Sequence, residues 1–230
     1  MRTSLFIILA LAACGDDGGK ATPDAKPMID APAAMIDAPA ATLDCNTYCT
    51  EIQTNCTAAN AQYPDMAHCL GTCKAFAPGA LADRTGDTLG CRIYHAGAPA
   101  AGDATLHCPH AGPGGDKISA ATAAFCSGGN VCEDFCNIHV KTCGTIAAPL
   151  TGITPQYQDM AACMTTCGNF PNKTTDYAAA ASKGDTLACR LYHVTNAAAN
   201  TDPAMISAHC LHSGPNGGAN QATCMTGTAP

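Results

Sequence analysis

The sequence predicts a mostly α-helical fold built from small disulfide-rich helical units in two tandem repeats. Cysteines recur at i, i+4 spacing, which places both sulfurs on one face of a helix. No segment keeps the alternating polar and apolar pattern of a strand over any length. The stretch at residues 86–95 recurs almost unchanged at residues 184–193, and seven other cysteines surround each copy in the same order.

The composition indicates that cross-links, more than a large apolar core, hold this fold together. Of the 230 residues only 13 % are charged and 5 % aromatic, and Trp is absent. Much of the apolar content is Ala, which buries little surface and therefore stabilises little. The 17 cysteines are the natural substitute for a thick core.

The charge balance excludes nucleic acid as a partner. The formal net charge is −7, and the 11 basic residues are scattered along the chain. Proteins that bind phosphate backbones need clustered Lys and Arg, and helices that lie on anionic membranes need a basic face. Neither pattern occurs in this sequence.

The N-terminus predicts export. Residues 1–4 are short and positive, and residues 5–13 are apolar but too few to span a bilayer. The following Leu-Ala-Ala-Cys-Gly at residues 11–15 resembles the lipobox of bacterial lipoproteins. That resemblance implies diacylglyceryl transfer to the sulfur of Cys14, cleavage before it, and a membrane anchor. An ordinary secretory signal is the alternative, and it leads to the same oxidising compartment.

Cysteine arithmetic agrees with the lipid assignment, because removing Cys14 leaves an even sixteen for disulfide pairing. We expect the protein to be anchored in the bacterial cell envelope, at the outer membrane or cell surface rather than the inner membrane. The expected organisation is a signal peptide (1–13), a lipidated Cys with a disordered Ala/Pro/Asp linker (14–41), Cys-rich helical repeat 1 (42–127) and Cys-rich helical repeat 2 (128–230). In the linker, residues 28–34 are repeated exactly as 35–41.

Each expected helix begins at a side chain that can cap its N-terminus, and Pro and Gly end it. In the second repeat, residues 157–160 match residues 63–66, and Asp202 followed by Pro203 is a strong helix start. Glycine loops at residues 109–115 and 211–218 follow helical segments that end at Cys108 and Cys210, and residues 117–126 can close the first repeat as its last helix. In the first repeat the expected caps are Thr42 or Asp44, Asp65, Asp87 or Thr88, and Asp103.

Half of the disulfides follow from helix geometry. Two antiparallel helices that each carry Cys-x3-Cys can be joined twice, outer to outer and inner to inner. The arrangement looks like the helical hairpins of twin Cys-x3-Cys proteins, such as the small Tim-type chaperones, and we carry no function across. The predicted pairs are Cys45–Cys73, Cys49–Cys69, Cys132–Cys167 and Cys136–Cys163.

Sequence cannot fix the other pairs, because eight cysteines allow 105 connectivities. By elimination, and by assuming that the last two cysteines of each repeat clasp the glycine loop, we expect Cys56–Cys91, Cys108–Cys126, Cys143–Cys189 and Cys210–Cys224.

The histidines are the one suggestive chemical set. Three neutral imidazoles can bind Zn or Cu and leave an open coordination position. The alternative is that these side chains cap helix ends or pack beside Tyr94 and Tyr192. His68 and His139 have no counterpart in the other repeat, and we expect them at the surface. The candidate metal ligands are His95, His107 and His110 in the first repeat and His193, His209 and His212 in the second.

These observations favour a non-enzymatic binding or structural module, with a protein or surface ligand as its partner and no cofactor. A metal- or haem-binding protein that uses the repeated histidines is the alternative, and an envelope enzyme is the second alternative. The sequence has no Cys-x-x-Cys redox motif, no His-Glu-x-x-His and no phosphate-loop ending. Catalytic residues are therefore not assigned.

Overall fold

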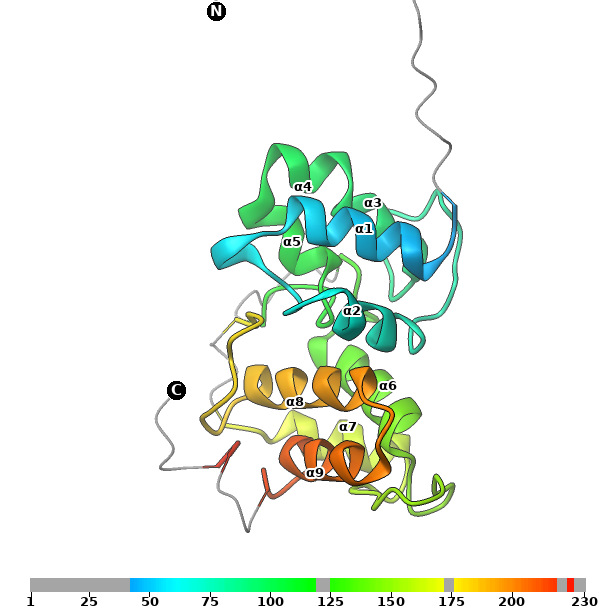
Figure 1. Cartoon of the computed structure of the whole chain (residues 1–230), viewed down its shortest axis with the longest axis vertical. Helices are drawn as coiled ribbons and strands as arrows, with labels where there is room; N and C mark the ends of the chain where they lie inside the picture. The colour runs from blue at the N-terminus through cyan, green and yellow to red at the C-terminus, as the bar shows by residue number, and fades with distance from the viewer. Residues whose placement is uncertain (1–41, 119–124, 172–175, 219–222, 226–230) are drawn as a thin grey trace, which may run out of the picture. The chain divides into compact units, whose positions relative to one another are not determined.

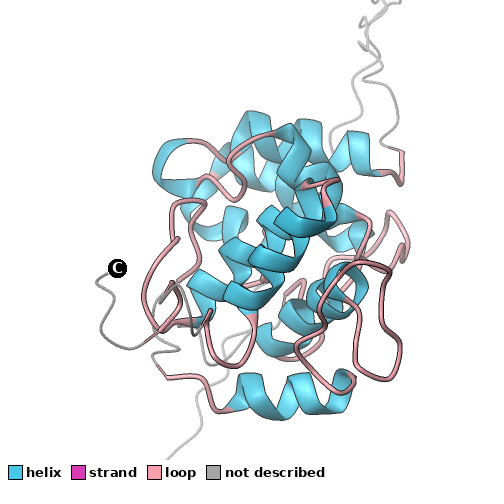
Figure 2. Cartoon of the chain, turned by 60° about the horizontal axis from the view of Figure 1, so that its bottom comes forward, coloured by secondary structure: helices cyan, strands magenta, loops and turns pink. Residues whose placement is uncertain are grey.

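A computed structural model describes residues 42–118, 125–171, 176–218 and 223–225. The expected signal peptide, Cys14 and linker lie outside these residues. Throughout the described residues the regular structure is helical, and the only extended pairing recorded there is an isolated bridge between Ala77 and Thr88 (Figure 2). The predicted mostly α, disulfide-rich fold is confirmed.

The helices of residues 42–127, here called the first half, form one group in Figure 1. Helix α1 packs against α2, α3 and α5, and α3 packs against α5. The bounds are α1 (Cys45–Asn55), the 3-10 turn η1 (Ala58–Asn60), α2 (Met66–Cys73), α3 (Leu89–Ala96), α4 (Ala98–Gly102) and α5 (Ala104–Ala111).

In the second half, residues 128–230, the described helices are α6, α7, α8 and α9, with no 3-10 turn and no helix recorded in the places of η1 and α4. Helix α8 packs against α6 and α9, and it also packs against α2 of the first half (Figure 1). Residues 40–230 accordingly form one compact unit. The bounds are α6 (Val131–Cys143), α7 (Met160–Gly168), α8 (Leu187–Ala199) and α9 (Pro203–Ser213).

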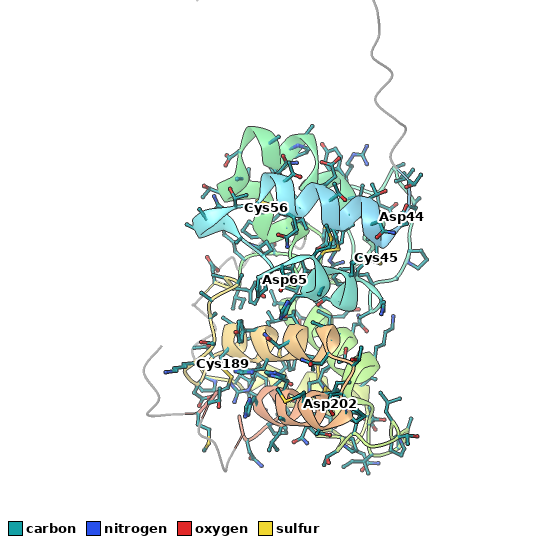
Figure 3. All side chains as sticks on the ribbon, viewed as in Figure 1. Asp44, Cys45, Cys56, Asp65, Cys189 and Asp202 are labelled. Atoms are coloured by element: carbon teal, nitrogen blue, oxygen red, sulfur yellow. A yellow bond between two sulfur atoms is a disulfide. The ribbon has the colours of Figure 1, made fainter. Side chains whose placement is uncertain are left out.

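Side-chain caps start most of these helices, as the sequence predicts. Asp44 accepts a hydrogen bond from the backbone N–H of Thr47, and Asp65 accepts one from that of His68. Figure 3 shows Asp44, Asp65 and Asp202 at the beginnings of their helices. Where two caps were considered, the structure uses Asp44 for α1 and Thr88 for α3. Such caps each contribute about 1 kcal/mol of stability.

Each helical hairpin has both of the disulfides predicted from the sequence. Cys45–Cys73 and Cys49–Cys69 join α1 to α2, with Cα atoms 5.8 and 5.7 Å apart. Cys132–Cys167 and Cys136–Cys163 join α6 to α7 at 5.7 and 5.9 Å. These separations are ordinary for disulfides.

The pairs expected by elimination are wrong. Cys56–Cys91 and Cys108–Cys126 are replaced by Cys56–Cys108 and Cys91–Cys126. Likewise, Cys143–Cys189 and Cys210–Cys224 are replaced by Cys143–Cys210 and Cys189–Cys224.

The physical reason for the exchange is the path of the chain after the glycine loop. The end of α1 packs on α5, which places Cys56 beside Cys108. The returning segment hydrogen-bonds to its own loop, with the backbone N–H of Cys126 donating to the carbonyl of Gly115 at 3.0 Å, but its sulfur lies against the start of α3 rather than beside Cys108. There the backbone N–H of Gly86 donates to the carbonyl of Phe125 at 2.6 Å, and Cys126 meets Cys91.

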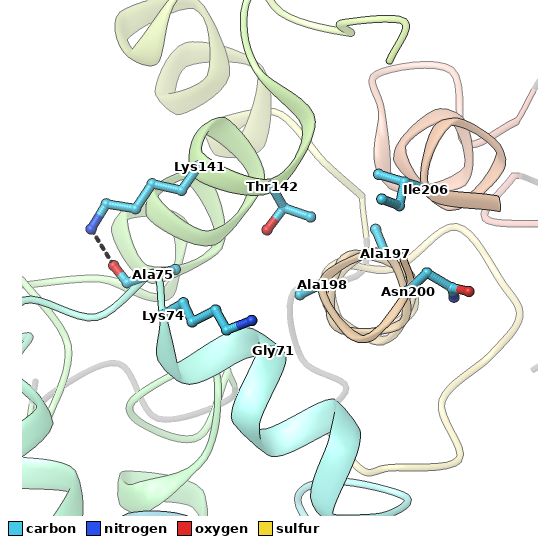
Figure 4. A pocket seen from close by; sticks show the side chains of 9 residues that line it. All are labelled: Gly71, Lys74, Ala75, Lys141, Thr142, Ala197, Ala198, Asn200 and Ile206. Carbon is cyan, nitrogen blue, oxygen red and sulfur yellow. Dashed lines mark hydrogen bonds between the residues drawn. The ribbon is translucent and has the colours of Figure 1, made fainter. Parts of the chain in front are cut away.

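A pocket of about 210 Å³ lies where α2, α6, α8 and α9 meet. Lys74 and Lys141 border it, and the Lys141 ammonium donates a hydrogen bond to the carbonyl of Ala75 (Figure 4). Ala197, Ala198 and Ile206 also line it. Among the described residues, no helix combines the length and apolarity needed to cross a membrane.

Candidate metal centres

In each half, three histidines meet where two helices pack together. His95 lies on α3, and His107 and His110 lie on α5. The spacing i, i+3 places both α5 imidazoles on the face that packs against α3. In the second half the same arrangement joins α8 and α9, with His193, His209 and His212. We call these the first and the second histidine triad.

The nitrogen atoms of each triad converge on one point. Nδ1 of His95 lies 3.0 Å from Nδ1 of His107. In the second triad, Nδ1 of His193 lies 3.1 Å from that of His209 and 3.4 Å from that of His212. Ligand nitrogens around a tetrahedral zinc ion, each about 2.0–2.1 Å from the metal, lie about 3.3–3.4 Å apart. The observed spacing is therefore close to that of a metal's coordination shell.

A backbone carbonyl fixes the tautomer of the central histidine in each triad. Nε2 of His95 lies 3.1 Å from the carbonyl oxygen of Arg84, and Nε2 of His193 lies 3.2 Å from that of Ser182. A carbonyl only accepts hydrogen bonds, so Nε2 carries the proton and donates it. Nδ1 of the neutral ring then directs its lone pair into the triad, an arrangement typical of metal-binding histidines.

His110 has an unsatisfied nitrogen. Its Nε2 lies 3.4 Å from Oδ1 of Asp116, and both side chains are buried. Its Nδ1 is also buried and has no hydrogen-bond partner among the described residues. Buried polar atoms are nearly always paired, so an orphaned one requires an explanation. A metal ion within the triad would supply the missing partner.

The triads favour neutral imidazoles, which are the form that binds metal. Burial, and then the neighbouring imidazoles, lowers the pKa of His110 to about 4. Burial likewise lowers the pKa of His193 to about 4. Burial also lowers the pKa of His95 and of His209. Near pH 7 His110 and His193 are therefore neutral.

Aromatic packing and a disulfide hold the first triad in place. The ring of Phe125 stacks on His110 with centroids 4.1 Å apart, and Tyr94 meets His95 edge-on at 5.0 Å. The Cys91–Cys126 sulfurs lie within 4.8 Å of a His95 nitrogen. Because these sulfurs are bonded to each other, they are not thiolates. The available donor set is three imidazoles.

Sequence reasoning grouped these six histidines correctly but missed their supports. Asp116 and the carbonyl groups of Arg84 and Ser182 were not expected to matter. The sequence did contain a signal for Asp116, because an acidic residue follows the glycine loop of the first half and none follows that of the second. The backbone carbonyls left no signal in the sequence.

The two unmatched histidines take no part in the triads. His139 was expected at the surface, but it is fully buried against Phe135 and Tyr157. The prediction is wrong because His139 occupies the core-facing position that Ile52 holds in the first half. His68 is partly exposed, and its ring nitrogens lie 2.7 Å from Asp65 and 3.1 Å from Asn196.

A family model matches part of the chain. The model of the BfoA family C-terminal domain matches residues 33–134, which is less than half of the chain. This span covers the whole first half, including its histidine triad, and ends within α6. No curated protein and no solved structure matches the chain. The description of the matching domain names no ligand or reaction, so the functional argument depends on the residues themselves.

Proposed function

We propose that this protein binds transition-metal ions at its two histidine triads and carries them on an exported, lipid-anchored, disulfide-stapled scaffold. The observation that carries the proposal is the buried, unpartnered Nδ1 of His110 in a group of converging imidazoles. The second half places three histidines in the same way at nearly the same spacing. Packing of the helices alone would not require imidazole nitrogens to converge in the same way in both halves.

The donor set favours zinc or copper. Imidazole nitrogens suit both metals, whereas calcium and magnesium prefer oxygen ligands. Three protein ligands leave a fourth position for water or for a donor group of a partner molecule. His107 and His209 are the least buried members of their triads, so this position would face solvent on their side.

Haem fits the triads less well. Haem iron takes its axial ligands on the two opposite sides of a flat ring. The three imidazoles of each triad instead approach one point from neighbouring helices, with ring centroids 5.0–5.7 Å apart in the first half. This crowding suits a single ion and leaves no space between the rings for a macrocycle.

Export and anchoring belong to the same proposal. The lipobox-like sequence before Cys14 supports attachment to a membrane, and the eight disulfides support an oxidising compartment. Mass spectrometry of the mature protein should find an acylated Cys14 at its N-terminus. An unmodified N-terminus cleaved elsewhere would refute the anchor and would leave the metal proposal standing.

Metal stoichiometry tests the function. Equilibrium dialysis of the oxidised protein against zinc, at pH 7 and without an affinity tag, should give about two bound ions per chain. Substitution His110→Ala or His212→Ala should each remove one ion, and the double variant should bind none.

Two substitutions outside the triads serve as matched controls. His68→Ala and His139→Ile remove histidines without touching a triad, so zinc binding should be unchanged. An apo wild-type protein, or a double variant that still binds two ions, would refute the proposal.

A further inference from the structure

A disulfide lies beside the central histidine of each triad. In the first half, the sulfur atoms of Cys91 and Cys126 lie within 4.8 Å of a nitrogen atom of His95. No other bridge of the described residues has both sulfurs this close to a histidine nitrogen, apart from the equivalent bridge of the second half. The matching group there is Cys189, Cys224 and His193.

Helix geometry brings one sulfur of each bridge to the triad. Cys91 and His95 are i, i+4 neighbours on α3, so both side chains lie on one face of that helix. Cys189 and His193 have the same spacing on α8. The second sulfur comes from the segment that returns after the glycine loop, as with Cys126. The two halves therefore build the same group of two sulfurs and one imidazole.

Reduction turns such a bridge into two possible metal ligands. A dithiol supplies two electrons and two protons, so the S–S bond breaks, two Cys thiols form, and the dithiol closes its own S–S bond. When zinc binds, the two thiol protons pass to water and both sulfurs become thiolates. Sulfur and nitrogen ligands around a tetrahedral zinc ion lie about 3.6 Å apart. The sulfurs are therefore within a small side-chain movement of that spacing.

The sulfurs and the triad share one lone pair. Nε2 of His95 donates its proton to the carbonyl of Arg84, so Nδ1 is the ligand atom of this imidazole. The same Nδ1 lies 3.0 Å from Nδ1 of His107, inside the triad. A zinc ion bound to His95 and to thiolates is therefore the ion of the triad and not a separate one.

We infer that the Cys91–Cys126 and Cys189–Cys224 bridges are redox switches of the triads, because their reduction by a dithiol adds thiolate ligands to the bound zinc ion. This inference rests on the proposed metal-binding function. Thiolates are ligands that zinc prefers, and they fill the position that three imidazoles leave open. A metal that binds the reduced form more tightly must favour reduction by the same factor. Zinc thus makes these two bridges easier to reduce than the remaining ones.

A dithiol titration of the wild-type protein tests the switch. The protein is incubated with graded ratios of reduced to oxidised dithiothreitol, either at a free zinc concentration fixed by a chelator buffer or with zinc removed. Alkylation and mass spectrometry then report the reduced fraction of each bridge. All four cysteines are buried, so incubation continues until these fractions stop changing.

Zinc should shift the two triad bridges alone. The dithiothreitol ratio that half-reduces Cys91–Cys126 and Cys189–Cys224 should fall at least about 5-fold when zinc is present, the lower end of typical coupling between two sites. The ratio for Cys56–Cys108 should not change. In a His95→Ala variant the zinc effect should vanish at Cys91–Cys126 and persist at Cys189–Cys224, which serves as the internal control.

Freed single thiols give a second readout. In a His212→Ala background, which leaves the first triad, Cys126→Ser frees the thiol of Cys91 beside His95. Zinc-edge X-ray absorption should then show about one sulfur per zinc ion at about 2.3 Å. The matched control, Cys73→Ser, frees Cys45, which belongs to neither group, and should show no sulfur.

The outcomes separate the switch from the function. A zinc effect that is absent, or equal at every bridge, in a protein whose oxidised form binds zinc would overturn the switch and leave the function standing. A zinc effect confined to the two bridges, in a protein whose oxidised form binds no zinc, would support the thiolate site and overturn binding by the imidazoles alone. Absence of both would overturn both.

Discussion

Arg92 in the first half forms an ion pair with Asp134 in the second half, and neither side chain is exposed to solvent. Arg92 also bonds Asp87 at 2.7 Å and lies 3.9 Å from the ring centroid of Phe76. Arg190, at the matching position, pairs with Asp185 as Arg92 pairs with Asp87. The Arg92–Asp134 pair is the one that ties the halves together, and the described residues record no second acid paired with Arg190.

Removal of one partner from this buried pair should be costly. Asp134→Ala leaves the Arg92 charge buried with one acid fewer, which typically costs about 3–5 kcal/mol. Urea unfolding of the oxidised protein, followed by circular dichroism, measures the change. Asp159→Ala is the matched control, because it removes only the exposed cap of α7 and should cost about 1 kcal/mol. Equal losses for the two variants would contradict the role given to the pair.

Gly71 should resist replacement even though it lies within a helix. Exchange of a helical Gly for Ala normally stabilises a protein by about 0.8–1 kcal/mol. At Gly71, however, a Cβ would collide with the backbone carbonyl of Ala198 on α8, where the halves pack closely. Gly71→Ala should therefore lower the thermal midpoint.

Gly168 provides the comparison for that substitution. It ends α7, and none of the described residues lies within 4 Å of the position its Cβ would take. Gly168→Ala should leave the midpoint unchanged or raise it. A rise in both variants would show that α2 and α8 do not approach as closely as the structure has them.

Disulfide mapping should find the pairs of the structure rather than those of simple elimination. Non-reducing digestion and mass spectrometry should recover peptides that join Cys56 to Cys108 and Cys91 to Cys126. Each bridge stabilises by about 2–4 kcal/mol, so excess reductant should also abolish the helical circular dichroism signal. Recovery of a Cys56–Cys91 peptide from natively folded protein would contradict the fold around the first triad.

His139 should make the stability depend on pH. Burial lowers its pKa to about 4, whereas the unfolded chain titrates near the ordinary value of about 6.5. Between these values the unfolded state binds more protons than the native state. The free energy of unfolding should therefore fall as pH falls from about 6.5 towards 4, by up to about 1.4 kcal/mol per unit.

Substitution His139→Ile isolates this contribution, because Ile52 already fills the matching position in the first half. Unfolding by urea at pH 7, 6 and 5 should show a shallower loss of stability in the variant than in the wild type. Parallel curves for the two proteins would mean that His139 is not buried in its neutral form.

Prediction from sequence succeeded where the relevant geometry is local. The i, i+4 spacing of Cys45 and Cys49 places both sulfurs on one helix face. The next pair of cysteines with this spacing lies on the facing helix, so both disulfides of the hairpin follow. Pairing of Cys56 failed because its partner depends on how α5 folds back across a loop, which no short-range spacing records. His95 and His107 were grouped only because the repeat copied them together.

Residues whose role depends on the tertiary environment escaped prediction. His139 looked like a surface residue because a lone polar side chain carries no sign of its partners. Its match to Ile52, an apolar residue of the first repeat, was the better guide to its burial. Asp116 became visible only when the loop placed it behind a histidine ring.

X-ray absorption at the zinc edge of the oxidised, zinc-loaded protein tests the central claim most directly. We predict a first shell that contains about three imidazole nitrogens per zinc at about 2.0–2.1 Å and no sulfur at about 2.3 Å. Two zinc ions per chain should give this signal, and the His110→Ala, His212→Ala double variant should give none. A sulfur shell, or zinc that remains bound in the double variant, would contradict metal binding by the histidine triads.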